Sequence, residues 1–77
     1  MPMYYFDYRH DGTVARDDIG SPMRSFDVAK TEAVRALTEL AKDELQKPLG
    51  RRLAIEVREG DVPLLEVVMT VEVKQLV

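Results

Sequence analysis

The sequence predicts a small α+β domain in the order ββαββ, with one amphipathic helix packed on one face of a four-stranded, mainly antiparallel sheet. Three observations predict this fold: an Asp-Gly step between two strand-like segments, a long stretch with apolar residues at helical spacing, and two alternating segments after it. We expect residues 1–77 to form a single domain, because a chain of 77 residues has room for one core.

The first hairpin is predicted from an aromatic segment, residues 3–9, which is typical of a strand. Alternation gives it a core face that carries Tyr4, Phe6 and Tyr8. The step Asp11-Gly12 predicts a tight turn, because glycine tolerates positive φ. Residues 13–16 are expected to form the short returning strand, and the turn-forming residues 17–22 to end it.

The helix is predicted over residues 27–46. Ser25 or Asp27 can cap the free amides at its start, whereas Pro48 and Gly50 end it near Gln46. Its apolar stripe is rich in alanine and comprises Ala29, Ala33, Ala36, Leu37, Leu40 and Ala41. Small side chains let the helix approach a sheet closely.

The second hairpin is predicted from residues 52–58 and 64–74, which alternate between apolar and polar side chains around a turn at residues 59–63. The apolar faces carry Leu53, Ile55 and Val57 in the first strand, and Leu65, Val67, Met69, Val71 and Val73 in the second. With strands numbered in chain order, base rates favour the sheet order 2-1-3-4, and the apolar last strand leaves 2-1-4-3 open.

Charge predicts the register of this hairpin. Val57 opposite Leu65 would place Glu56 opposite Glu66, an unfavourable pair of like charges. We therefore expect Val57 to lie opposite Val67.

Composition narrows the functional classes. The net charge is −3 with both signs scattered, which argues against nucleic-acid binding. The one basic cluster, Lys47, Arg51 and Arg52, follows the helix, where cations meet the negative end of its dipole. The chain contains no cysteine, signal-peptide pattern or stretch of the roughly 20 apolar residues that span a bilayer, so we expect a cytoplasmic protein.

Residues that commonly carry chemistry are sparse. His10 is interpreted as a solvated turn residue, because no nucleophile accompanies it. Asp11, Asp17 and Asp18 lack the spacing of a calcium loop and are interpreted as turn residues. The glycines Gly12 and Gly20 are isolated and form no phosphate-binding loop. We therefore predict no catalytic, metal-binding or cofactor-binding residue, and no cofactor.

The sheet face without a helix is the most suggestive surface. Apolar residues expected there, among charged ones, are Met3, Tyr5, Ala54, Leu64 and Val68. Such residues are either simply solvated or mark an interface for a homodimer or another protein.

The whole chain resembles a family of uncharacterised bacterial small domains, a domain of unknown function. The resemblance is carried by residues 5–9, Asp11-Gly12, residues 17–20, 29–43 and 53–58. It implies the fold and no catalytic residue, because the family has no assigned activity.

A looser resemblance is to HicB-type antitoxin domains, carried by residues 4–6, Asp11-Gly12, Gly20 and 25–41. It implies a binder of a small basic partner, although the Pro-x-x-Pro-Gly-like segment before the helix is missing. Three functions therefore stand as hypotheses: a non-enzymatic interaction or structural module that self-associates through the sheet face or a strand edge, an antitoxin-like binder, and a small enzyme using His10 and nearby Asp residues.

Overall fold

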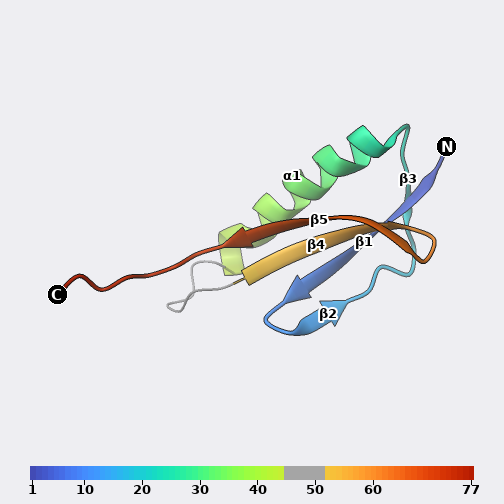
Figure 1. Ribbon diagram of the computed structural model, residues 1–77. Coiled ribbons are helices and arrows are strands. Elements are labelled where there is room, and N and C mark those ends of the chain that lie inside the picture. Colours follow the sequence, from blue (N-terminus) through green and yellow to red (C-terminus); the bar gives the residue numbers. More distant parts are fainter. Residues whose placement is uncertain (45–51) are drawn as a thin grey trace.

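The computed structural model describes residues 1–44 and 52–77. It is an α+β fold in which one helix lies along one face of an antiparallel sheet (Figure 1). The elements are β1 (Met3–His10), β2 (Thr13–Ala15), β3 (Ser21–Pro22), α1 (Phe26–Glu44), β4 (Arg52–Glu59) and β5 (Val62–Thr70). Within the described ranges, no helix is long and apolar enough to cross a membrane.

The sheet order is β2-β1-β4-β5, and all of its strand pairs are antiparallel. This confirms the favoured 2-1-3-4 order of the four predicted strands. The two-residue strand β3 was not predicted, since residues 17–22 were interpreted as a turn throughout. β3 pairs with the start of β1, where Tyr4 lies opposite Ser21.

Both hairpins turn through two residues. Asp11 and Gly12 have φ values of 46° and 83° between the paired residues His10 and Thr13, as a type I′ turn requires. In the second hairpin Gly60 has a φ of 59° and begins the turn. The predicted Asp-Gly turn is therefore confirmed.

The core lies between α1 and the inner face of the sheet, which is the face toward the helix. Ser25 caps the helix as expected, because its Oγ accepts a hydrogen bond from the Val28 N–H at 3.3 Å. Tyr4, Phe6 and Tyr8 belong to the core as predicted. The other buried members are Ala29, Ala33, Leu37, Ala41, Leu53, Ile55 and Val57, and Leu65, Val67 and Met69 pack against them.

The helix is observed to Glu44, and residues 45–51 lie outside the described part of the chain. The predicted helix end near Gln46 and the basic residues Lys47 and Arg51 fall in this range.

The predicted register of the β4–β5 hairpin is wrong. Val57 lies opposite Leu65, not Val67, and an irregularity follows between Val57 and Arg58. The tight turn explains this register, because Glu59 and Val62 pair directly across it and leave no slack for a two-residue shift.

The two like charges that lie opposite each other in this register are each paired with a cation at another position. Glu56 does lie opposite Glu66, but each carboxylate also forms an ion pair with an arginine. Arg9 Nη2 is 3.1 Å from Glu56 Oε2, and Arg52 Nη2 is 3.2 Å from Glu66 Oε1. The charge prediction failed because it considered only the residues directly opposite.

The last strand ends earlier than predicted. β5 stops at Thr70, opposite Arg52, whereas the sequence pattern continues to Lys74. Beyond Arg52, β4 offers no described residue for pairing. Residues 71–77 leave the sheet as an extended tail, drawn in red in Figure 1.

Candidate functional site

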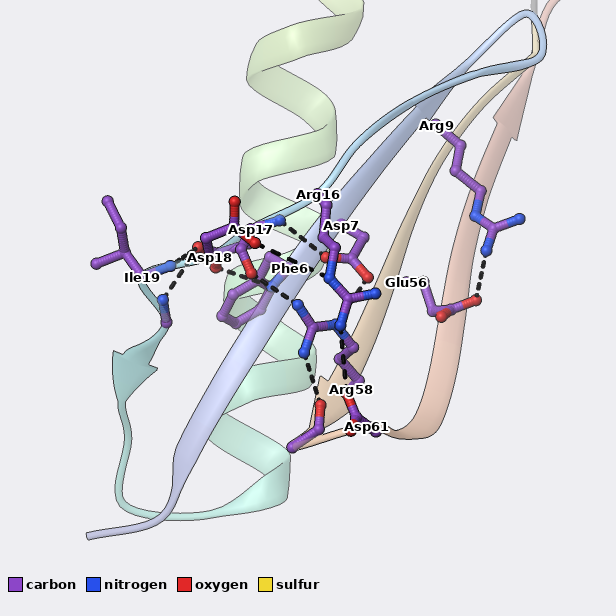
Figure 2. A network of polar contacts seen from close by, with 12 residues as sticks. Phe6, Asp7, Arg9, Arg16, Asp17, Asp18, Ile19, Glu56, Arg58 and Asp61 are labelled. Atoms are coloured by element: carbon purple, nitrogen blue, oxygen red, sulfur yellow. Dashed lines mark hydrogen bonds and ion pairs between the residues drawn. The ribbon is translucent and has the colours of Figure 1, made fainter.

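The outer face of the sheet, away from α1, carries a buried ion pair between Asp7 of β1 and Arg58 of β4. Arg58 Nε donates a hydrogen bond of 2.9 Å to Asp7 Oδ2, and the two residues are only 6% and 5% exposed. The guanidinium also donates to the Gly60 carbonyl oxygen at 2.6 Å and to the Asp17 carbonyl oxygen at 2.7 Å. Arg58 thus binds a neighbouring strand, its own hairpin turn and the loop after β2 (Figure 2).

Tyr5 and Gly20 pack beside this ion pair. The guanidinium carbon of Arg58 lies 4.5 Å from the centre of the Tyr5 ring, a distance at which a cation is attracted to an aromatic face. A Cβ atom at Gly20 would lie 2.7 Å from that ring, and Gly20 has a φ of 78°. Only glycine fits this position without strain.

Asp17 joins the network from the loop after β2. Its Oδ1 accepts hydrogen bonds from the Ile19 and Gly20 N–H groups, both at 3.0 Å. Its Oδ2 accepts one of 3.1 Å from the Phe6 N–H, in the stretch of β1 between the residues that pair with β3 and β2. The Asp17 N–H in turn donates to Asp7 Oδ1 at 2.9 Å. The Asp17 carboxylate therefore accepts the hydrogen bond of the Phe6 N–H in a stretch of β1 that pairs with neither β2 nor β3.

These contacts keep both carboxyl groups ionised. Burial raises the pKa of Asp7, but the hydrogen bond from Arg58 and the one from the Asp17 N–H outweigh it, and the pKa lies below its ordinary value of 3.8. Burial likewise raises the pKa of Asp17, and the N–H groups of Gly20, Phe6 and Ile19 reverse the shift to below 3.8. The charged groups of Asp7, Asp17 and Arg58 all contact neighbouring groups. This network therefore holds the loop after β2 and the β4–β5 turn against the sheet.

The interpretation of His10 as a solvated turn residue is wrong. It is the last residue of β1, and its side chain is 25% exposed. Its Nε2 lies 2.8 Å from Glu44 Oε2 at the end of α1 and 3.3 Å from Asp11 Oδ2, while its ring stacks on Tyr8. Burial and then the charges of Glu44 and Asp11 raise the pKa of the Tyr8 hydroxyl. His10 therefore joins the helix end to the first hairpin.

The three turn aspartates are not brought together. Asp17 is held in the network with Asp7, and Asp11 is beside His10. Asp18 is exposed, with its Oδ1 3.9 Å from Arg16 Nε.

The apolar residues predicted as an interface do not form one patch. Met3 and Tyr5 lie at one end of β1, whereas Val68 lies in the row of Ala54. Between these two groups runs a charged row made of Asp7, Glu56 and Glu66. Ala54 itself has no exposed surface, so its assignment to an exposed interface is corrected: it is packed within the sheet.

Among the predicted interface residues, Leu64 and Val68 belong to β5, and they are 38% and 44% exposed. β5 is the last strand of the described sheet, so its outer edge faces no other described strand. Among the described residues, seven of the fifteen exposed large apolar side chains lie in β5 and the tail that follows it, residues 62–77, and the others are spread over the N-terminal segment, β2 and the loop after it, and α1.

Sequence reasoning did not single out Asp7 and Arg58, which lie on the sheet face without a helix. Alternation says which face a residue occupies, and it does not say that a loop distant in the sequence will cover that face. The signal that was present is a lone acid, Asp7, between the aromatic residues Phe6 and Tyr8.

Comparisons with known proteins identify the family and leave the activity open. The searches found no match among curated proteins and none among solved structures. The likeness to HicB-type antitoxin domains is not shown. The profile of the domain of unknown function DUF6894 matches residues 3–70, which span all five strands and the helix. The chain therefore belongs to the DUF6894 family.

Proposed function

We propose that this domain is a non-enzymatic protein-interaction module that accepts an extended strand along the free edge of β5. One observation carries the proposal: β5 is the terminal strand of the described sheet, and it runs directly into a tail whose apolar residues Val73, Leu76 and Val77 are exposed. An exposed sheet edge presents unpaired N–H and C=O groups, and an added strand satisfies them.

The side chains of β5 support this binding mode. Leu65, Val67 and Met69 face the core but stay only half-buried, because the sheet has no described strand beyond them. Natural edge strands are usually protected by charge or proline. β5 has Pro63 and Glu66, and the stretch after Glu66 is the apolar Val67-Val68-Met69. An incoming strand would cover these side chains as well as the backbone.

The charged groups of the outer face support a structural role for that face. Asp7, Arg58 and Asp17 are saturated by one another and by backbone groups. Arg9 and Glu56 pair across the same face. A ligand on this surface would have to displace contacts that already hold the fold together.

The test measures binding of extended peptides by fluorescence polarisation. The first probe is a labelled synthetic peptide of residues 62–77, and the others come from a displayed library of ten-residue peptides. We expect apolar, extended peptides to bind, and the variant Val68→Pro to lose this binding because a prolyl ring obstructs the edge. The control is Val34→Lys, on the exposed face of α1, and it should bind the peptides normally. A proline is not used at this position because it would break α1.

Circular dichroism must show that Val68→Pro keeps its fold. The charged edge variant Val68→Lys provides a second test, since it removes apolar surface without constraining the backbone. Binding that is equal in the wild type and both edge variants contradicts the proposal, and so does the absence of any peptide binding together with a strictly monomeric chain.

A further inference from the structure

Residues 71–77 have the pattern of a strand, and they pair with no strand in the described part of the chain. Val71 and Val73 continue the inner-face alternation of β5, but Val73 is 74% exposed and Leu76 is 92% exposed. The radius of gyration is 14.0 Å, against about 11–12 Å for a compact chain of this length. The tail therefore projects away from the domain with its apolar side chains in water.

We propose that a second copy of this chain occupies the β5 edge, with β5 and the tail of each copy pairing antiparallel about a two-fold axis at Thr70. This inference rests on the proposed function, because it names the occupant of the same edge. The tail of each copy lies along β5 of the other, and the two sheets become one continuous sheet with both helices on the same face.

Alternation and length restrict the register. Side chains directly opposite in an antiparallel pair point to the same face, so the axis must pass through a residue and not between two residues. Residues 62–77 pair over their greatest length when the axis lies at Met69 or Thr70. An axis at Met69 would place Glu66 opposite Glu72 of the second copy, two like charges.

An axis at Thr70 instead places residues of opposite charge across from each other. Glu66 then faces Lys74 of the second copy, and this attractive pair occurs twice by symmetry. Glu66 keeps Arg52 on its other side, at 3.2 Å. No turn joins the two copies, so side chains decide their register, in contrast to the β4–β5 hairpin, whose register follows from its tight turn.

The same axis matches the apolar side chains. On the inner face Val67 lies opposite Val73 of the second copy, and Met69 opposite Val71. On the outer face Leu64 meets Leu76. The half-buried edge of the core is thus covered by the tail residues that the monomer leaves in water.

An axis at Val73 is the main competitor. It would oppose Glu72 and Lys74, which also attract, but within residues 62–77 it joins only residues 69–77 of the two copies and leaves most of β5 unpaired by this segment. The two registers differ in the pairing of Glu66, which lies opposite Lys74 of the second copy only when the axis is at Thr70. The experiments below use this difference.

The first experiment measures self-association by analytical ultracentrifugation from about 1 µM to 1 mM, the range in which weak interfaces associate. We expect a reversible dimer. Each of the variants Glu66→Lys and Lys74→Glu places two pairs of like charges opposite each other in the dimer. The dissociation constant of each dimer should therefore rise about 10-fold. In an equimolar mixture of the two variants both pairs become attractive again, and the heterodimer should form with wild-type affinity. Glu72→Lys has the same net charge as Glu66→Lys, and it should weaken the dimer less because Glu72 faces the uncharged Val68.

The second experiment uses the absence of cysteine from the sequence. Thr70→Cys places one thiol beside its symmetry mate, so mild oxidation should yield a covalent dimer on a non-reducing gel. Val73→Cys is the matched control, because its thiol would lie opposite Val67. Thr70→Cys should cross-link at least about 10-fold faster than Val73→Cys, since directly opposite strand residues have Cβ atoms about 5 Å apart.

Faster cross-linking of Val73→Cys, or failure of the mixed charge variants to regain affinity, overturns the register at Thr70. A chain that remains monomeric to 1 mM overturns the second copy as occupant. If such a monomer still binds extended peptides at the β5 edge, the proposed function stands and only this inference fails. If it binds none, both fail.

Discussion

The ion pair between Asp7 and Arg58 leads to the sharpest prediction on stability. The substitution Asp7→Asn keeps the shape of the side chain and an oxygen for the Asp17 N–H, but it removes the carboxylate that is hydrogen-bonded to the buried Arg58 guanidinium. Removing one member of a buried pair typically costs about 3–5 kcal/mol of unfolding free energy. Because asparagine retains an acceptor, we expect the lower end, about 3 kcal/mol, for Asp7→Asn.

A loss of this size is large for so small a domain. The melting temperature should fall by about 12–24 °C, since each kcal/mol moves it by about 4–8 °C in a domain of 60–100 residues. Urea unfolding followed by far-ultraviolet circular dichroism measures the change directly. Glu56→Gln is the matched control on the same face, because its partner Arg9 is half-exposed and such pairs contribute at most about 1 kcal/mol.

A double-mutant cycle separates the ion pair from the other contacts of Arg58. If the two groups act together, Asp7→Asn combined with Arg58→Met should lose less stability than the sum of the single variants. An Asp7→Asn variant no less stable than Glu56→Gln, or a double variant whose loss equals the sum, would refute the view that this pair is a buried, coupled unit.

Two further predictions concern the same network. The pKa values of Asp7 and Asp17 are lowered on folding, so their stabilisation is present above about pH 4 and lost as the pH falls through the folded-state values. The urea midpoint should stay level from about pH 7 to 5 and fall below pH 4, and the fall should be shallower in Asp17→Asn; an equally steep fall there would contradict the assignment. Gly20→Ala meets the Tyr5 ring and a φ of 78°, whereas Gly12→Ala meets a φ of 83° and no atom within 4 Å. Gly20→Ala should therefore cost more, by about 1 kcal/mol or above, in the same unfolding assay.

The parts of the fold that depend on local patterns were predictable. The helix follows from the spacing of Ala29, Ala33 and Leu37, and the inner faces of the strands follow from their alternation. The first turn follows from glycine chemistry at Gly12. These features need only residues that are near one another in the sequence.

The parts that depend on distant partners were not predictable in the same way. Asp7 and Arg58 are 51 residues apart, and no local sequence pattern around either residue indicates that they form an ion pair. The register prediction for the second hairpin failed because Glu56 and Glu66 pair with cations that are not directly opposite them in the sheet. The predicted length of β5 was wrong, because pairing ends at Thr70, which lies opposite Arg52, the first described residue of β4.

The opposite border of the sheet has a consequence for assembly. There β1 is flanked by three residues of β2 and two of β3, and the Asp17 carboxylate takes up an N–H between them. This interrupted border offers no continuous template on which another chain can grow. If the β5 edges pair as proposed, association through strands would be one-sided, and it would stop at a closed pair instead of propagating into fibres.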